Sequence, residues 1–364
     1  MSKKKHHSES ALNVQKGIDQ PSQINPKVTT GGHRFRKDKL STKDIFNGII
    51  SGDRTLISRG ITLIESELSE DKAAAQELIQ RCLPHSGKSI RIGVTGVPGV
   101  GKSTFIETFG LNLIKQNYKV AVLAIDPSST RTKGSILGDK TRMETLSVNE
   151  NAFIRPSASK GTLGGVARAT REALILCEAA GFDIILIETV GVGQSETAVS
   201  QLVDFFLLLM LAGGGDELQG IKRGIMEMAD LIVINKADGD NITKAQVAVS
   251  IYKNALHLFP ALPNGWTPDV LTASATENMG IHNVWEKINE FMLQTKANGY
   301  FEKNRKEQAL TILNDTIESN LNSNFYNDHT IIKLMDNYKK KIYNDEINPY
   351  EVAQLLLDEY YRER

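Results

Sequence analysis

Cysteine is scarce in this chain, which has only Cys82 and Cys177 among its 364 residues. The two lie far apart in the sequence, so they form neither a metal-ligand pair nor the disulfide framework of a small secreted protein. Such sparse use of cysteine suits a reducing compartment, and we expect the protein to be cytoplasmic.

An excess of either charge is also lacking, because 43 Lys and Arg residues balance 43 Asp and Glu residues. The composition therefore gives no electrostatic reason to expect nucleic acid or a membrane as a partner. No run of about 18 apolar residues is present, and the most apolar stretch, Phe205 to Leu211, is too short to span a bilayer. The basic start of the chain is not followed by an apolar segment, so we expect no secretory signal.

The first part of the chain changes character twice. Residues 1–40 are polar and interrupted by Pro and Gly, which predicts a disordered tail. Residues 41–86 repeat apolar side chains at helical spacing around a break at Gly52 and Asp53, and they predict an N-terminal helical element. Its last helix should run from Glu70 to Cys82 and stop before Pro84.

Helical periodicity returns in residues 301–364. An apolar stripe recurs there at Leu310, Leu313, Ile317 and Leu321. Further on, Asn348, Pro349 and Glu351 form a helix start, with a cap, a first-turn proline and a capping-box partner. These helices are amphipathic and have few packing partners in the sequence. Packing onto the rest of the chain is one interpretation, and helix exchange in a homodimer is the one we favour.

Between these ends, strand and helix patterns alternate, which is typical of a mostly parallel sheet covered on both faces. We therefore predict an α/β domain over residues 87–300. One helix should span Gly165–Ala180 and end at Gly181. The predicted strands are Ile90–Thr95, Lys119–Ile125, Ala152–Ile154, Asp183–Glu188, Phe205–Leu211, Leu231–Asn235 and Val270–Ala273.

A phosphate-binding motif follows the first predicted strand. The residues Gly96, Gly99, Gly101, Lys102 and Ser103 satisfy G-x-x-x-x-G-K-[ST]. A triphosphate must be wrapped by backbone N–H groups at close range, so the loop needs glycines and a helix N-terminus behind it. In this role Lys102 reaches the outer phosphates and the Ser103 hydroxyl is suited to Mg²⁺. The remaining residues expected to line the nucleotide are Val97, Pro98, Val100 and Thr104.

Three acidic residues are candidates for the metal side of this site. Asp126 ends the second predicted strand, Asp139 follows on the next loop, and Glu188 ends the strand Asp183–Glu188. Ligands of open parallel sheets bind outside the carboxyl ends of the strands, so carboxylates placed there face metal and phosphates. A helix N-cap is the alternative for either Asp, and a buried structural carboxylate for Glu188. Gly191, three residues after Glu188, can offer its N–H to the γ-phosphate.

The segment Asn235-Lys236-Ala237-Asp238 follows another apolar strand and indicates the base. The Asp238 carboxylate can accept from the guanine N1–H and exocyclic amine together, whereas adenine would leave that charge unpaired. The aliphatic stem of Lys236 can lie on the base plane. Ser274 and Ala275, after the last strand, can contact the base oxygen through their backbone. We therefore expect GTP and GDP rather than adenine nucleotides.

The order of these motifs resembles the MeaB/ArgK-type GTPases, over about residues 42–300. The resemblance implies a P-loop NTPase of the SIMIBI type, related to the signal-recognition and metallochaperone GTPases. It implies Mg²⁺ surrounded by Ser103, Asp126, Asp139 and Glu188, and a homodimer formed through C-terminal helices. It also implies a chaperone role toward an adenosylcobalamin-dependent acyl-CoA mutase, of which methylmalonyl-CoA mutase is the family's client.

One departure from Ras-like proteins concerns hydrolysis. Those proteins place a water-orienting Gln directly after the switch glycine, but here that position is Val192 and Gln194 lies two residues further on. We expect slow intrinsic hydrolysis until a partner repositions Gln194 or brings Lys222 or Arg223 onto the developing charge. A solvated helix face is the alternative for Lys222 and Arg223.

Other functions fit less well. A kinase linked to lysine, arginine and ornithine transport, an older label for part of the family, would need a base that positions the acceptor, and none is apparent. A nickel-insertion GTPase would need Cys and His ligands beside the phosphate loop. Ribosome targeting to membranes would need a Met-rich domain, and the chain has only eight Met.

Overall fold

The computed structural model describes residues 40–66, 68–126, 143–158, 163–189, 195–213 and 223–362. By its contacts the chain divides into Met1–Ser41 and Thr42–Arg364. Nearly all of the described residues belong to the second unit, whose elements are described below. The predicted boundaries within that unit remain predictions, and the tail predicted for residues 1–40 lies almost wholly outside the described residues.

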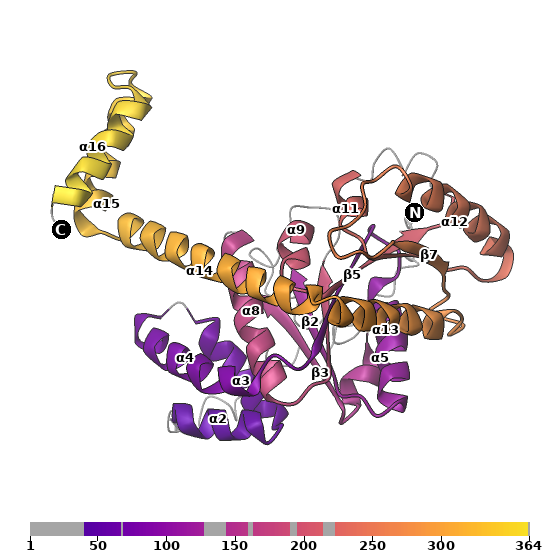
Figure 1. Cartoon of the computed structure of the whole chain (residues 1–364). Coiled ribbons are helices and arrows are strands. Elements are labelled where there is room, and N and C mark those ends of the chain that lie inside the picture. Colours follow the sequence, from indigo (N-terminus) through magenta and orange to yellow (C-terminus); the bar gives the residue numbers. More distant parts are fainter. Residues whose placement is uncertain are drawn as a thin grey trace, which may run out of the picture. The chain divides into compact units, whose positions relative to one another are not determined.

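A seven-stranded sheet forms the centre of the unit (Figure 1). Its strands lie in the order β3-β2-β4-β1-β5-β6-β7. Every described pairing between neighbouring strands is parallel. β1 therefore lies between β4 and β5, with its end beside theirs. The strands are β1 Ile90–Gly96, β2 Val120–Asp126, β3 Ala152–Ala158, β4 Ile184–Thr189, β5 Phe205–Leu211, β6 Leu231–Asn235 and β7 Asp269–Thr272.

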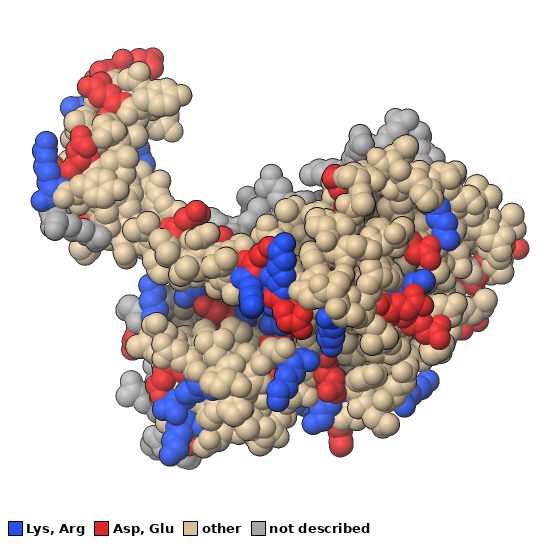
Figure 2. Space-filling view, in the orientation of Figure 1, with Lys and Arg blue, Asp and Glu red and all other residues tan. Residues whose placement is uncertain are grey.

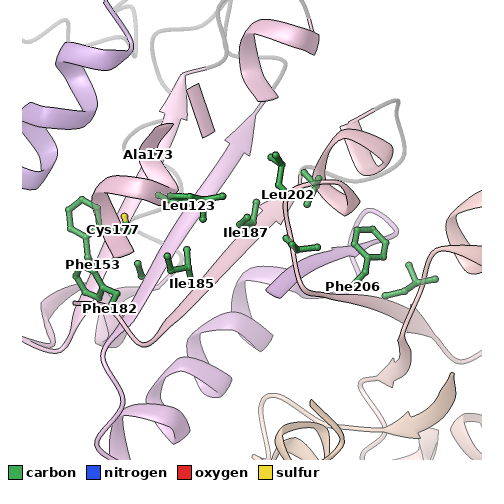
Figure 3. Packing of buried hydrophobic residues seen from close by; sticks show 14 of the residues in the cluster. Leu123, Phe153, Ala173, Cys177, Phe182, Ile185, Ile187, Leu202 and Phe206 are labelled. Atoms are coloured by element: carbon green, nitrogen blue, oxygen red, sulfur yellow. The ribbon is translucent and has the colours of Figure 1, made fainter. Parts of the chain in front are cut away.

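Side chains that alternate along the strands feed two separate cores, one on each face of the sheet. In β4, Ile184 and Leu186 enter the core that contains α5 (Lys102–Lys115) and α13 (Ile281–Ala297). Ile185 and Ile187 enter the other core, beside α8 (Leu163–Ala179). Figure 3 shows Ile185 and Ile187 with Cys177 and Phe153 in this second core. Both faces are thus covered, as the continuous apolar strands predict.

The N-terminal helices α2 (Thr42–Ile50), α3 (Arg54–Ile64) and α4 (Ser69–Cys82) pack on one another and on α8. Asp53 begins α3 as its N-cap, because its carboxylate accepts from the N–H groups of Thr55 and Leu56. The break predicted at Gly52 and Asp53 is therefore a turn between two helices.

Short helices complete the connections between strands. They are the 3-10 turn η1 (Leu83–His85), α7 (Glu144–Val148), α9 (Ser195–Ser200), α11 (Arg223–Glu227) and the 3-10 turn η2 (Gly239–Asn241). A longer helix, α12 (Ile242–Leu256), connects β6 to β7. α12 packs beside β6 and β7. These elements connect the strands.

Three helices follow α13: α14 (Tyr300–Tyr326), α15 (His329–Tyr343) and α16 (Pro349–Arg362). Asn348 caps α16 by accepting from the N–H of Tyr350, as its sequence predicts. α15 and α16 share a small core that includes Ile331, Val352, Leu356 and Tyr360. Leu355, on the same helix, is exposed.

The element predictions are largely confirmed, with shifted ends. Seven strands form at the predicted places, although β3 continues four residues beyond Ile154 and β7 begins one residue before Val270. The helix predicted over Gly165–Ala180 is α8, Leu163–Ala179. No helix among the described residues is long and apolar enough to cross a membrane. On the face drawn in Figure 2, acidic and basic side chains are interspersed, in keeping with the balanced charge.

Candidate nucleotide-binding site

The predicted phosphate loop joins the end of β1 to the start of α5. Gly96 leaves no room for a side chain, because a Cβ there would lie 2.4 Å from the carbonyl oxygen of Leu209 on β5. Gly101 has φ of 90°, a left-handed conformation that glycine adopts without strain. The glycines thus allow the backbone to curl in front of the helix N-terminus, where an anion is favoured.

Lys102 is the first residue of α5, and its ammonium group lies over the loop. Its Nζ donates to the carbonyl oxygen of Gly96 at 3.0 Å and approaches that of Val97 at 3.4 Å. The lysine charge is therefore held above the loop whose N–H groups would surround phosphates.

Ser103 and Glu188 meet across 85 residues of sequence. The Ser103 Oγ donates to the Glu188 Oε1 at 3.0 Å, and Glu188 is only 8% exposed. The sheet explains the meeting, since Glu188 on β4 is paired with Val94 on β1, just before the phosphate loop. Beside them, the buried hydroxyls of Thr189 and Thr95 bond at 2.8 Å, which ties the ends of β4 and β1 together.

Asp126 is the last residue of β2, one position beyond the pairing of Ile125 with Thr189. Its backbone therefore lies at the same carboxyl edge as Glu188, as predicted, although the structure does not describe its side chain. Four other predicted site residues lie outside the described residues: Asp139, Gly191, Gln194 and Lys222. The side chain of Arg223 is not described either.

The segment after β6 is bonded directly to the phosphate loop. Asn235 Nδ2 donates to the carbonyl oxygen of Val100 at 2.8 Å, and Lys236 Nζ donates to that of Gly99 at 2.9 Å. Lys236 has φ of 58°, so this stretch turns sharply. The two contacts set the distance between the segment predicted to bind the base and the loop predicted to bind phosphates.

Asp238 accepts hydrogen bonds from two hydroxyl groups in the loop that follows β7. Ser274 Oγ donates a short hydrogen bond to Asp238 Oδ2, and Thr276 Oγ1 approaches the same oxygen at 3.4 Å. Glu277 N–H in turn donates to Ser274 Oγ at 3.2 Å. The carboxylate is therefore oriented before any ligand binds, which lowers the conformational entropy lost on binding.

The structure brings together the predicted residues of two groups: Lys102, Ser103 and Glu188 at the phosphate end, and Asn235, Lys236, Asp238, Ser274 and Ala275 at the base end. Thr276 and the pair formed by Thr95 and Thr189 were not predicted from the sequence. No local sequence pattern predicts these contacts, because each one joins segments that are distant in the sequence and are brought together by the sheet.

A strand, a glycine loop with its lysine, a serine bonded to an acidic residue on the neighbouring strand, and an oriented base segment define a P-loop NTPase. The carboxyl edge of the sheet carries all of them, which is the usual place for ligands of open α/β sheets.

The family described as "Methylmalonyl Co-A mutase-associated GTPase MeaB" matches residues 57–330 of this chain. The "GTPase ArgK" of Escherichia coli (strain K12) is 50% identical over 278 residues, which cover 76% of this chain and 84% of that protein. The "Methylmalonic aciduria type A homolog, mitochondrial" of Mus musculus is 44% identical over 331 residues, covering 88% and 80%. A solved structure described as "LAO/AO transport system kinase" has a TM-score of 0.69 and 36% identity, and covers 88% of this chain and 97% of its own.

The chain therefore belongs to the MeaB family, and it is a GTPase. The resemblance seen in its motifs is confirmed, and so is the fold that the resemblance implies.

Proposed function

We propose that this GTPase binds GTP with Mg²⁺ and couples hydrolysis to assistance of an adenosylcobalamin-dependent acyl-CoA mutase. The assistance would be cofactor loading, protection or reactivation of a mutase of the methylmalonyl-CoA type. The observation that carries the nucleotide part is the oriented Asp238 beside a base segment bonded to the phosphate loop. The family description and the name of the mouse relative support the client.

The residues present fit a magnesium ion. Mg²⁺ prefers hard oxygen ligands and usually keeps few protein ligands beside phosphates and water. The Ser103 hydroxyl and the Glu188 carboxylate meet at 3.0 Å between Oγ and Oε1, and the backbone of Asp126 lies at the same edge. Ser103 and Glu188, with Asp126 and Asp139, would hold the ion, directly or through water. When bound, Mg²⁺ would neutralise charge on the phosphate oxygens.

At the base, the Asp238 carboxylate would accept from the guanine N1–H and exocyclic amine. Its orientation by Ser274 and Thr276 lowers the entropy lost on binding. The Lys236 stem runs toward Gly99 and can cover one face of the ring. The Ala275 N–H would donate to the guanine O6.

Hydrolysis is the step for which we propose partner control. Lys102 would stabilise charge on the outer phosphates, and Gly191 would donate its N–H to the γ-phosphate. A partner would reposition Gln194 or bring Lys222 or Arg223 onto the developing charge. The Val192 position, where Ras-like proteins carry Gln, supports this proposal.

The test measures GTP hydrolysis by the purified chain alone and with a purified adenosylcobalamin-dependent mutase. We expect slow release of phosphate alone and at least a tenfold rise with the mutase. A matched control uses Asp238→Asn, which should prefer xanthosine triphosphate, so that the mutase then stimulates only the xanthine reaction. Absence of stimulation by any such mutase would remove the client and leave the GTPase.

A second function has one observation in its favour, the solved structure described as a transport system kinase. A kinase would transfer the γ-phosphoryl group to a protein or small acceptor. Radiolabelled γ-phosphate distinguishes the two, because a kinase leaves label on an acceptor and a hydrolase releases it as inorganic phosphate.

We also propose that the chain forms a homodimer through α14. The stripe formed by Leu310, Leu313, Ile317 and Leu321 is exposed, at 61%, 54%, 49% and 58%. At 100° per residue, this stripe lies opposite the face on which Arg305 and Gln308 contact the segments before β1 and β5, and Asp315 contacts α8. A second copy would cover it. A cytoplasmic location completes the proposal, supported by two buried free thiols, Cys82 and Cys177.

A further inference from the structure

The helix that follows the phosphate loop also touches the loop after β7. Thr108, on α5, donates its hydroxyl hydrogen to the carbonyl oxygen of Ala275 at 2.9 Å, across 167 residues. Four residues later on the same helix face, Asn112 Nδ2 donates to Asn278 Oδ1 at 2.5 Å. The helix α5 therefore contacts the loop of residues 274–280 at two positions, Ala275 and Asn278.

The direction of the Thr108 hydroxyl is unusual for a threonine inside a helix. Such a hydroxyl commonly bonds to the carbonyl four residues earlier. Four other helical threonines of this structure do so: Thr62, Thr295, Thr311 and Thr316. Thr108 instead points across to Ala275, so its hydroxyl contributes to the loop rather than to its own helix.

The two peptide groups that flank Ala275 are each held from outside. The carbonyl of Ser274 accepts from the N–H of Met279 at 3.0 Å, and that of Ala275 accepts from Thr108. No cis peptide occurs in the described chain, and in a trans peptide the C=O and the N–H point in opposite directions. The Ala275 N–H therefore points away from Met279, and within the described residues it has no backbone acceptor.

Backbone geometry closes this loop tightly. Asn278 has φ of 53° and Gly280 has φ of 71°, and a Cβ at Gly280 would lie 2.3 Å from the carbonyl oxygen of Thr272. Ser274 and Met279 exchange both backbone hydrogen bonds, at 2.9 and 3.0 Å, which holds the two ends of the loop together. Among the described residues the Ala275 carbonyl accepts from no backbone N–H, so the Thr108 hydroxyl of α5 supplies the restraint there.

We propose that Thr108 and Asn112 are positioning residues for recognition of the guanine O6, because they hold the Ala275 peptide in the orientation that offers its N–H. The inference rests on the proposed base site. It adds that α5, which begins directly after the phosphate loop, also holds the Ala275 peptide. One helix would therefore fix the distance between the phosphate site and the base site.

The experiment compares Thr108→Val with the rescue variant Thr108→Ser and the control Thr311→Val, which removes a hydroxyl bonded only within α14. Affinities are measured with Mg²⁺ for GTP, for inosine triphosphate, which keeps O6 and lacks the amine, and for 6-thio-GTP, whose sulfur is a weak acceptor. We expect Thr108→Val to weaken GTP and inosine triphosphate alike, by about fivefold, the value of one net hydrogen bond. Binding of 6-thio-GTP should fall less than about twofold.

Thr108→Ser should restore GTP affinity, Thr311→Val should leave all three affinities unchanged, and Asn112→Ala should give the Thr108→Val pattern more weakly. An equal loss for all three nucleotides, or no loss for any, would overturn the role of Thr108. Failure of Asp238→Asn to shift preference toward xanthosine triphosphate would instead overturn the base site itself. Thermal unfolding of each variant confirms that the proteins compared are folded.

Discussion

At the scale of single residues, Glu188 links β4 to the helix that follows the phosphate loop, because its carboxylate accepts from Ser103 at the start of α5. Replacing it by Gln keeps an oxygen that can accept from Ser103 and removes the charge that would face Mg²⁺. We expect single-turnover GTP hydrolysis to fall by about a hundredfold or more. Guanine nucleotide binding measured without Mg²⁺ should stay within about twofold, because the base contacts are untouched.

The matched control is Glu77→Gln, which removes an equal charge from an exposed pair with Arg81 on α4. It should leave hydrolysis unchanged. A Glu188→Gln protein that hydrolyses GTP at the normal rate would show that this carboxylate is only structural.

Asp230, just before β6, is a second informative residue, and it lies away from the nucleotide. Burial raises the pKa of its carboxyl from 3.8 to about 7, although the N–H of Phe206 and the amide of Asn264 stabilise the charge. Between these two pKa values the folded state binds more protons than the unfolded state. The free energy of unfolding contributed by this group therefore falls as the pH rises from 3.8 to about 7.

The expected result for Asp230→Asn follows from that sign. The amide cannot ionise, so the variant should lose less stability than the parent between pH 5 and pH 8, by roughly 1–3 kcal/mol. Urea unfolding at several pH values measures the difference. Parallel curves for the two proteins would mean that the folded-state pKa of Asp230 is ordinary.

How far single residues could be predicted depends on whether their partners lie in the same motif. Lys102 and Ser103 stand inside one short pattern, and Glu188 and Asp238 follow apolar strands, so position along the chain was enough. Thr108 carries no such signal. Its partner is 167 residues away, and only the packing of α5 against the loop after β7 creates the contact.

At the scale of elements, one arginine anchors α14 to the sheet. Arg305 donates to Asp204 at 2.5 and 2.7 Å, to the carbonyl of Ser89 at 2.9 Å, and lies 3.5 Å from Glu178. The side chains of Asp204 and Glu178 are 1% and 0% exposed. Removal of the arginine leaves buried negative charge with fewer partners, which is costly.

We therefore expect Arg305→Met to lower the free energy of unfolding by about 3 kcal/mol. Lys303→Met is the control, because Lys303 lies 3.7 Å from Glu307 in an exposed pair on the same helix. It should cost no more than about 0.5 kcal/mol. Denaturant midpoints report both values, and equal midpoints for the two variants would contradict the anchoring role of Arg305.

The elements themselves show where a sequence pattern is sufficient. Apolar runs bounded by polar residues predict that a strand exists, and all seven exist. Strand ends are set by partner strands, so β3 extends to Ala158 beside β2 although its second half has Arg155 and Pro156. The order of strands and the short helices α7, α9 and α11 depend on tertiary packing, which periodicity does not encode.

At the scale of the whole molecule, the candidate nucleotide site and the contacts that anchor α14 lie at opposite ends of the strands. The phosphate loop, Glu188 and Asp238 lie at the carboxyl ends of the strands. Arg305 meets Ser89 and Asp204, which precede β1 and β5 at the amino ends. α14 is thus fastened at the opposite edge from the nucleotide, and Arg171 of α8 bonds to its Asp315 further along. Self-association through α14 should then leave nucleotide binding undisturbed.

This arrangement allows the proposed homodimer to be tested apart from the GTPase. Glutamates at Leu313 and Ile317 would place charge in the centre of the exposed stripe, where a second copy would bury them unpaired. We expect Leu313→Glu with Ile317→Glu to sediment as a monomer at concentrations where the parent is a dimer. Basal GTP hydrolysis should stay within about twofold, because no contact of the nucleotide site is altered.

The control places the same two charges at Ser319 and Asn322, which are exposed on the other side of α14. That protein should remain a dimer, which separates the effect of the stripe from that of added charge. If both variants and the parent sediment alike, as monomers or as dimers, the stripe is not the interface. Because the stripe lies opposite the Arg305 anchor, a monomeric stripe variant should also keep the parent's denaturant midpoint at low protein concentration, where association no longer adds to stability.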